Sequence, residues 1–283
     1  MATYKEKVGT SVVNYAGNYP GAVEGELWYD STNKNFNYQY ANVTAAGSWS
    51  AGNSMNTARE QLSGAGIQTG ALAIGGQTST EVANTEAYNG TSWTEVNDLT
   101  TARRTLASAG TNTSALAYGG NSTTAIVAVT EKWNGTNWTE VNDLNTARKG
   151  LSGAGTDNEA VIAIGGENPS VDVANTETWN GTNWTEVNDL NSARKFFAAA
   201  GTETNALAFG APPGATELWN GTNWTEVNDL NTGRGGLAGA GPYTAALAFG
   251  GGPPAKNETE LWNGTNWTEQ NNLGTARFYL GGA

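Results

Sequence analysis

Short runs of apolar and small residues, separated by glycine-containing turns, recur along the chain. Between Arg148 and Arg194 the run GLSGAG is followed by AVIAIGG and, after a variable segment, by TETW and WTEV on either side of NGTN. Short glycine-punctuated runs are typical of buried strands, and Asn180-Gly181 suits a tight hairpin turn. No stretch has convincing apolar spacing at i, i+3, i+4 and i+7, so the pattern predicts an all-β protein with about four strands per unit.

The unit recurs along almost the whole chain. A tryptophan stands ten residues before an arginine six times, and successive arginines are 40 to 46 residues apart. The pairs are Trp49/Arg59, Trp93/Arg103, Trp138/Arg148, Trp184/Arg194, Trp224/Arg234 and Trp267/Arg277. A fixed period of this length indicates an array of supersecondary units that stack on one another.

The first run of each unit is unusually small. Residues 64–66, 153–155 and 239–241 all read Gly-Ala-Gly. Glycine inside a strand indicates that another part of the chain approaches closely. Six strands converging on one axis would produce such crowding, so the pattern favours a radial β-propeller over a flat solenoid.

The two ends of the chain supply complementary pieces of one unit. The last unit stops after its first strand, while residues 11–18 align with 114–121 and residues 25–28 with 216–219. We therefore expect a lead-in segment at 1–10 and one six-bladed propeller over 11–283. One blade is split between 11–56 and 277–283, and the C-terminal strand pairs with N-terminal strands to close the ring. An insertion at about 29–46 is expected to form an extra hairpin.

The order of residues in each unit resembles the kelch repeat. An arginine precedes a Gly/Ala-rich strand, a second strand ends in Gly-Gly (Gly-Ala at 210–211), and Glu-x-Trp/Tyr and a further Trp follow. The Gly-His and Trp-Asp dipeptides of WD40 repeats are absent. The resemblance implies a kelch-like propeller over about 11–283, but it does not decide activity, because such propellers include binding modules, structural parts and a few oxidases.

A second resemblance concerns biological setting. Residues 25–38, GELWYDSTNKNFNY, are similar to short segments of bacteriophage tail-fibre and other virion proteins, which are often cysteine-poor, Gly/Asn/Thr-rich and repetitive. The resemblance implies a protein of the phage particle surface, on tail or capsid, that is made in the host cytoplasm without a signal peptide. Other virion proteins, and a host-surface glycan or receptor, are then its expected partners.

Composition narrows the chemistry. The chain has 14 Lys+Arg against 26 Asp+Glu, a formal charge of -12, which disfavours nucleic acid and anionic membranes as partners. There is no histidine and no cysteine, which excludes a Ser-His-Asp triad, histidine-ligated metals, thiolates and the histidine and cysteine-linked tyrosine of copper oxidases. We expect no enzyme activity, no metal and no cofactor. The start lacks the apolar stretch of a signal peptide, and no run is long enough to insert into a membrane.

Each repeated arginine has a repeated glutamate available, two residues before the first aromatic of the unit: Glu26, Glu86, Glu131, Glu177, Glu217 and Glu260. A buried Arg-carboxylate pair explains a fixed arginine in every unit, and the alternative is an arginine cluster for an acidic ligand. The aromatic pairs, with Trp93, Trp138, Trp184, Trp224 and Trp267 as second members, are expected to pack between blades. Their alternative role is to stack on sugars. The Asn-x-Thr and Asn-Asp motifs are expected to cap turns rather than to carry glycans or calcium.

Two sets of positions vary between otherwise similar units. One follows the Gly-Gly doublet, and the other is the pair after each arginine: Glu60-Gln61, Arg104-Thr105, Lys149-Gly150, Lys195-Phe196, Gly235-Gly236 and Phe278-Tyr279. Variable loops on a rigid scaffold are common binding sites, although unconstrained drift is the alternative. The candidate binding residues are Arg104, Lys149, Lys195, Phe196, Phe278 and Tyr279, which suit an acidic or neutral glycan.

Three functions are compatible with these patterns. The favoured one is a non-enzymatic virion protein, either architectural or an attachment module for a host glycan or protein. An intracellular kelch-type protein-interaction module is the alternative. A carboxylate-based glycan hydrolase is the least favoured, because no acid and base pair stands outside the repeated positions.

Overall fold

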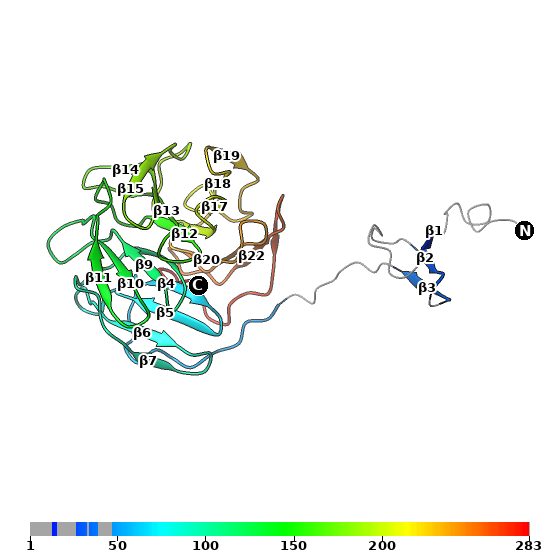
Figure 1. Ribbon diagram of the computed structural model, residues 1–283, viewed down its shortest axis with the longest axis horizontal. Coiled ribbons are helices and arrows are strands. Elements are labelled where there is room, and N and C mark those ends of the chain that lie inside the picture. Colours follow the sequence, from blue (N-terminus) through cyan, green and yellow to red (C-terminus); the bar gives the residue numbers. More distant parts are fainter. Residues whose placement is uncertain (1–12, 16–26, 33, 39–46, 283) are drawn as a thin grey trace, which may run out of the picture. The chain divides into compact units, whose positions relative to one another are not determined.

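A computed structural model describes residues 13–15, 27–32, 34–38 and 47–282 (Figure 1). The chain divides into two compact units, Met1–Gly47 and Ser48–Ala283. Each unit is considered by itself below.

The larger unit is a β-propeller of five four-stranded blades, and in each blade the strands follow one another from the axis outwards (Figure 1). Blades 1 and 2 consist of β4 (Ser63–Ile67), β5 (Gly70–Ile74), β6 (Thr85–Tyr88), β7 (Trp93–Glu95), β8 (Ala107–Gly110), β9 (Ala115–Tyr118), β10 (Thr130–Trp133) and β11 (Trp138–Val141). Blade 3 consists of β12 (Ser152–Gly155), β13 (Val161–Glu167), β14 (Asp172–Trp179) and β15 (Trp184–Val187). Blades 4 and 5 consist of β16 (Ala198–Gly201), β17 (Ala206–Phe209), β18 (Thr216–Trp219), β19 (Trp224–Val227), β20 (Ala238–Ala240), β21 (Leu247–Phe249), β22 (Thr259–Trp262) and β23 (Trp267–Glu269).

The all-β fold with four antiparallel strands per blade is as predicted, but the predicted number of six blades is wrong. Five sheets form over residues 48–282, and the N-terminal strands form a separate three-stranded sheet of β1 (Val13–Tyr15), β2 (Leu27–Asp30) and β3 (Asn35–Tyr38). Strand β1 pairs parallel with β2, whereas the second and third strands of every blade pair antiparallel. The sequence alignment of residues 11–18 and 25–28 with the second and third strands of a blade therefore predicts antiparallel pairing, whereas β1 and β2 pair in parallel.

Strands β2 and β3 form the hairpin that the sequence predicts between LWY and FNYQY. A hairpin joins segments a few residues apart, whereas the predicted closure joins the two ends of the chain, so the local pairing has the smaller entropic cost. Glu26, the repeated glutamate of the predicted split blade, lies outside the described residues.

The C-terminal segment nonetheless reaches the axis of the propeller, where Gly282 lies against Gly64 of β4 and Gly239 of β20. A Cβ atom built on Gly64 would lie 2.5 Å from the carbonyl oxygen of Gly282, and one built on Gly282 would lie 2.2 Å from that of Gly239. Residues 278–282 thus lie between the first strands of blades 5 and 1 without joining a sheet.

Large residues on one blade meet small residues on the next, which explains the small first strands. A Cβ atom on Gly153 would lie 1.7 Å from the hydroxyl of Tyr118, and one on Gly239 would lie 2.6 Å from the ring of Phe209. At Gly64 the close neighbour is backbone, as the pattern predicts, but at these two positions the nearest atom is an aromatic side chain of the preceding blade.

In four of the five blades the aromatic pairs pack between blades, as predicted, whereas Tyr88 and Trp93 of blade 1 are only half-buried. Trp179 and Trp184 are 1% and 6% exposed and share a core with Leu116 and Tyr118 of the preceding blade. The indole Nε1 of Trp184 donates to the hydroxyl of Thr130 across the same interface at 3.1 Å. Equivalent indole–threonine bonds are made by Trp138, Trp224 and Trp267. Because Trp138, Trp184, Trp224 and Trp267 are buried and bonded, their rings are not available to a sugar.

The arginine–glutamate pairs form in all five blades and are buried: Arg59–Glu86, Arg103–Glu131, Arg148–Glu177, Arg194–Glu217 and Arg234–Glu260. In blade 3 the Arg148 Nη1 lies 2.5 Å from Glu177 Oε1, and Glu177 Oε2 also accepts the backbone N–H of Asn145. Burial lowers the pKa of Arg148, opposed by the charge of Glu177. The pair ties the third strand to the segment that enters the blade.

The asparagine motifs make turns and inter-blade bonds. Asn134 Oδ1 accepts the backbone N–H groups of Thr136 and Asn137, as predicted for turn capping. Asn142 Nδ2 donates to Thr182 O and to Asn183 Oδ1 of the next blade. Asn183, which begins the Asn-x-Thr triplet 183–185, therefore makes a hydrogen bond between blades. Asp143 Oδ1 accepts the backbone N–H of Thr130.

Candidate functional site at the channel mouth

Six segments, each following a repeated arginine, meet around one mouth of the central channel. The second residue after each arginine donates its backbone N–H to the carbonyl of the same position in a neighbouring segment, at 2.6–3.1 Å. The members are Gln61, Thr105, Gly150, Phe196, Gly236 and Tyr279. The last bond runs from Gln61 N to Tyr279 O, so the hydrogen bonds form a closed ring, called the mouth ring below.

The mouth ring requires an uncommon backbone conformation. All six residues have positive φ, between 50° and 61°, and four of them are not glycine. Positive φ is unfavourable for β-branched and bulky residues such as Thr105 and Phe196. Backbone strain held by surrounding structure is a recurrent property of binding sites. The sequence signal is faint: two of the six positions, Gly150 and Gly236, are glycine.

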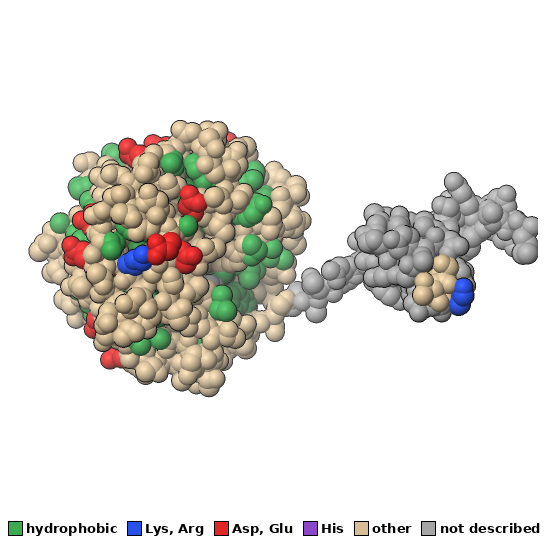
Figure 2. Space-filling view, viewed as in Figure 1, with side chains coloured by type: hydrophobic (Ala, Val, Ile, Leu, Met, Phe, Trp, Pro, Cys, Tyr) green, Lys and Arg blue, Asp and Glu red, His purple; other side chains and the backbone are tan. Residues whose placement is uncertain are grey.

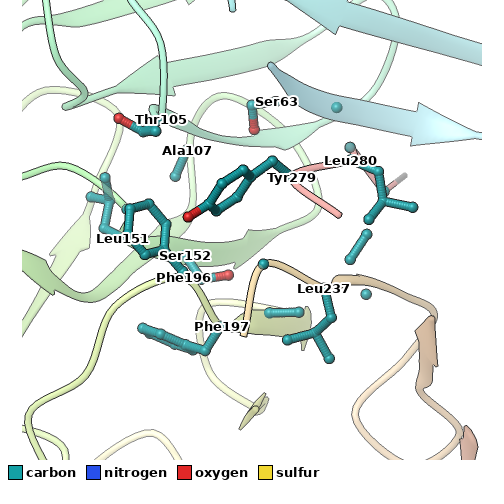
Figure 3. Close-up of a pocket in the computed structure, with 18 of the residues that line it drawn as sticks. Ser63, Thr105, Ala107, Leu151, Ser152, Phe196, Phe197, Leu237, Tyr279 and Leu280 are labelled. Atoms are coloured by element: carbon teal, nitrogen blue, oxygen red, sulfur yellow. The ribbon is translucent and has the colours of Figure 1, made fainter. Parts of the chain in front are cut away.

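The mouth ring surrounds a cavity of about 140 Å³ (Figure 3). The rings of Phe196 and Tyr279 lie side by side in it, with centroids 5.2 Å apart and planes inclined at 60°. Glycine at two neighbouring positions leaves room for these rings, because a Cβ atom on Gly150 would lie 2.9 Å from Phe196 and one on Gly236 would lie 3.1 Å from Tyr279. A side chain at position 150 or 236 would therefore displace the ring of Phe196 or Tyr279.

Hydroxyl groups line the same cavity. Ser108 Oγ lies within hydrogen-bond distance of Ser63 Oγ and Gly64 O, and Thr105 Oγ1 donates to the carbonyl of Arg104. Among the residues that the structure describes, the hydroxyls of Ser152 and Tyr279 have no hydrogen-bond partner. Among the described residues that line the cavity there is no Asp, Glu, Lys or Arg, so these residues offer aromatic faces and uncharged hydroxyls.

The predicted basic residues lie beside the mouth ring, but two of them are neutralised. Arg104 Nε lies 3.0 Å from Glu81, and Arg104 also donates to Gln61. Lys195 Nζ lies 2.6 Å from Glu167 and 3.1 Å from Asp172. The hydrogen bond with Glu167 raises the pKa of Lys195, which stabilises its charged form.

Two candidate residues differ from these in their surroundings. Lys149 is half-buried, and its ammonium group has no partner among the described residues. Phe278 is 39% exposed and is not among the residues that line the cavity, and its ring lies 4.9 Å from that of Tyr279 with the planes inclined at 52°. Of the six predicted binding residues, Phe196 and Tyr279 alone line the cavity.

The two variable sets of the sequence lie next to each other. In four blades an isolated β-bridge joins the residue that follows the repeated arginine to the residue that follows the glycine doublet. These bridges are Glu60–Gln77, Arg104–Asn121, Lys149–Glu167 and Gly235–Gly252. The variable positions therefore share the face that carries the mouth ring.

The surface of the larger unit is mostly uncharged. On the face shown in Figure 2, uncharged polar side chains, glycine and backbone cover most of the area. Acidic groups are scattered over this face, and basic atoms lie beside acidic ones. Within the described residues, no cluster of three Asp, Glu, His or Cys is placed to hold a metal ion. The described part of the chain also has no helix of the length and hydropathy needed to cross a bilayer.

A second cavity of about 170 Å³ lies further along the same six segments. Its lining is glycine and alanine except for Ser108, so it offers almost no side-chain chemistry. The candidate site is therefore the mouth cavity and not the channel as a whole.

Comparison with known proteins adds no family assignment. No protein-family model matches the chain, and none of the curated proteins compared with it is significantly similar in sequence. The chain is a β-propeller of repeated four-stranded blades.

Proposed function

We propose that this chain is a non-enzymatic, kelch-like binding propeller of a bacteriophage particle, and that its mouth cavity takes a neutral glycan of the host surface. The observation that carries the proposal is the pair of rings, Phe196 and Tyr279, held in a hydroxyl-lined cavity by residues with strained backbones. Sugar rings present apolar C–H faces and many hydroxyls, which match aromatic faces and unpaired hydroxyl groups.

A neutral ligand fits the electrostatics better than an acidic one. Arg104 and Lys195 already have carboxylate partners, and a net charge of -12 repels anions at long range. A hydroxyl-rich neutral ligand needs no free cation. Binding to a neutral glycan therefore requires no rearrangement of these ion pairs.

Binding is also favoured over hydrolysis at this cavity. Glycoside hydrolysis uses two carboxyl groups that flank the bond to be cleaved, and no Asp or Glu stands among the described residues of the cavity lining. The repeated glutamates are held in buried ion pairs with the repeated arginines. These observations support a site that holds its ligand unchanged.

The kelch-like part of the proposal is supported by the roles of the repeated residues. Each repeated motif has a structural use: the arginine pairs with the glutamate, the second tryptophan packs against the preceding blade, and Gly120 of a doublet donates its N–H to Arg148 O. The virion setting is supported by the similarity of residues 25–38 to phage tail-fibre segments.

The decisive variant is Phe196→Gly. It removes one ring, while glycine tolerates the positive φ of this position, as Gly150 and Gly236 do in the same ring. We expect an unchanged melting temperature and at least a tenfold weaker affinity for the neutral oligosaccharide selected on a glycan array, equivalent to about 1.4 kcal/mol. Affinity is measured by titration calorimetry on the full chain.

Phe278→Ala is the matched control, because it removes a ring outside the cavity. It should bind the same oligosaccharide as the parent does, and the double variant Lys149→Ala/Lys195→Ala should also retain binding. Full affinity in Phe196→Gly, or no neutral glycan bound by the parent, would contradict the proposal. Adsorption of particles carrying Phe196→Gly to host cells then tests the setting.

A further inference from the structure

The interface between blades 5 and 1 differs from the other four interfaces of the propeller. It contains the C-terminal segment, residues 277–282, and the segment 48–58 that precedes blade 1. We call this interface the seam. Both segments repeat interactions that belong to a blade, but within residues 48–282 no strand lies between them.

The C-terminal segment occupies the place of a first strand. Arg277 O accepts the N–H of Gly251, as Arg148 O accepts that of Gly120 in the preceding blade. Leu280 packs 3.0 Å from the Cβ position of Gly250, as Leu151 packs 3.1 Å from that of Gly119. Tyr279 completes the mouth ring. The segment is therefore fixed at the inner end of the seam.

Trp49 occupies the place of the tryptophan in a fourth strand. Its Nε1 donates to the hydroxyl of Thr259 in blade 5 at 3.0 Å, and its ring lies 4.9 Å from that of Phe249. Trp184 makes the same two contacts, with Thr130 and Tyr118. The seam thus has the contacts that the first and fourth strands of a blade make. Within residues 48–282 no strand fills the second-strand and third-strand positions of the seam, which are called the missing positions below.

Residues that face these missing positions are more exposed than their equivalents. Trp49 is 40% exposed, whereas Trp138, Trp184 and Trp224 are 6% exposed and Trp267 is 5% exposed. Leu247 is half-buried, whereas its equivalents in the first four blades are at most 1% exposed. On the opposite side of the seam, Trp93 is also half-buried.

Arg277 is the clearest difference. The equivalent arginines Arg103, Arg148, Arg194 and Arg234 are at most 5% exposed and each binds a glutamate of the third strand. Arg277 is exposed, and its guanidinium has no partner among the described residues. The backbone carbonyl of Arg277 is bonded as those of the equivalent arginines are, so Arg277 stands at the position from which each of the others binds a glutamate.

We infer that the seam is a docking site for an extended two-stranded segment of a partner protein, with a glutamate two residues before an aromatic residue. The partner strand that carries these residues would take the third-strand position, where its glutamate would pair with Arg277 and its aromatic ring would pack beside Trp49. The other partner strand would take the second-strand position, along the outer edge of residues 280–282. Strand addition of this kind uses main-chain hydrogen bonds for affinity and side-chain pockets for specificity. The five existing Arg–Glu pairs are the internal precedent for this chemistry. The inference does not depend on glycan binding at the mouth.

A peptide from the chain itself supplies the probe. Residues 206–219 comprise β17 and β18 and include Glu217 and Trp219, the required glutamate and aromatic. We expect the fluorescein-labelled peptide to bind the full chain saturably in fluorescence anisotropy. The peptide with Glu217→Gln, and the protein with Arg277→Ala, should each weaken binding at least tenfold. Arg277→Ala should leave the melting temperature unchanged, because Arg277 is exposed.

Lys149→Ala is the control for a general loss of positive charge, and it should bind the peptide as the parent does. Oligosaccharide binding of Arg277→Ala should also be unchanged, which separates this site from the mouth cavity. Absence of peptide binding to the full chain would overturn the inference. So would equal binding of the two peptides, or equal binding by the parent and Arg277→Ala.

Discussion

Deletion of residues 278–283 is expected to lower the melting temperature by on the order of 10 °C and to promote aggregation. The deletion removes two mouth-ring hydrogen bonds, each worth about 0.5–1.5 kcal/mol, and the packing of the half-buried Leu280, worth about 1–2 kcal/mol. For a unit of this size, about 1 kcal/mol corresponds to about 2–4 °C. The deletion also exposes the inner edges of β4 and β20, and exposed strand edges tend to pair with other chains.

Differential scanning calorimetry and light scattering on the full chain and the truncated chain measure these effects. Phe278→Ala is the control, because its side chain is exposed and makes no mouth-ring bond. A truncated chain that stays monomeric and melts at the temperature of the parent would show that the C-terminal segment does not hold blades 5 and 1 together.

Replacement of Arg148 by alanine is expected to destabilise the protein by about 3–5 kcal/mol, because Glu177 is left as an uncompensated buried charge. Both side chains are fully buried. Urea denaturation at neutral pH measures the free energy of unfolding. The double variant Arg148→Met/Glu177→Leu should recover part of the loss, since apolar residues of similar size remove both charges together.

The matched control is the surface pair of Lys132 and Glu159, in which the Glu159 side chain is 60% exposed. Lys132→Ala should cost at most about 1 kcal/mol, as is usual for solvent-exposed ion pairs. If Arg148→Ala unfolds at the same urea concentration as the parent but no longer binds ligand, the repeated arginines are functional and not structural.

Most of the blade could be predicted from the sequence, because each element repeats with its own chemistry. The glycine-punctuated strands, the Asn-Gly hairpin, the Arg–Glu pairs and the packing of the tryptophans all recur in register, so one unit explains the others. Trp184 is an example: its spacing from Trp179 placed it across a hairpin, and the structure pairs the two residues.

The blade count could not be predicted, because it depended on two short alignments. Residues 25–28 match the third strand of a blade in sequence, but four residues carry no information about the direction of pairing. In the structure β2 pairs with β3 in a hairpin and with β1 in parallel. Local pairing within the first 47 residues thus replaced the pairing expected with the C-terminal segment.

The candidate site was predicted in part. The pair after each arginine does lie at the channel mouth, and Phe196 and Tyr279 line the cavity. The acidic partners of Arg104 and Lys195 could not be predicted, because Glu81, Glu167 and Asp172 come from the variable segments, where the repeat gives no register. The mouth ring itself left no pattern of residue type beyond the glycines at 150 and 236, since backbone groups make all of its bonds.

Amide hydrogen exchange at the mouth ring tests the central claim, that six segments including the C-terminal one enclose a single rigid site. Exchange is followed residue by residue by NMR. We predict that the N–H groups of Gln61 and Tyr279, which close the ring, exchange as slowly as those of Thr105, Gly150 and Phe196. Rapid exchange at Gln61 and Tyr279 beside slow exchange at the other three would contradict the claim, because the ring would then be open between blades 5 and 1.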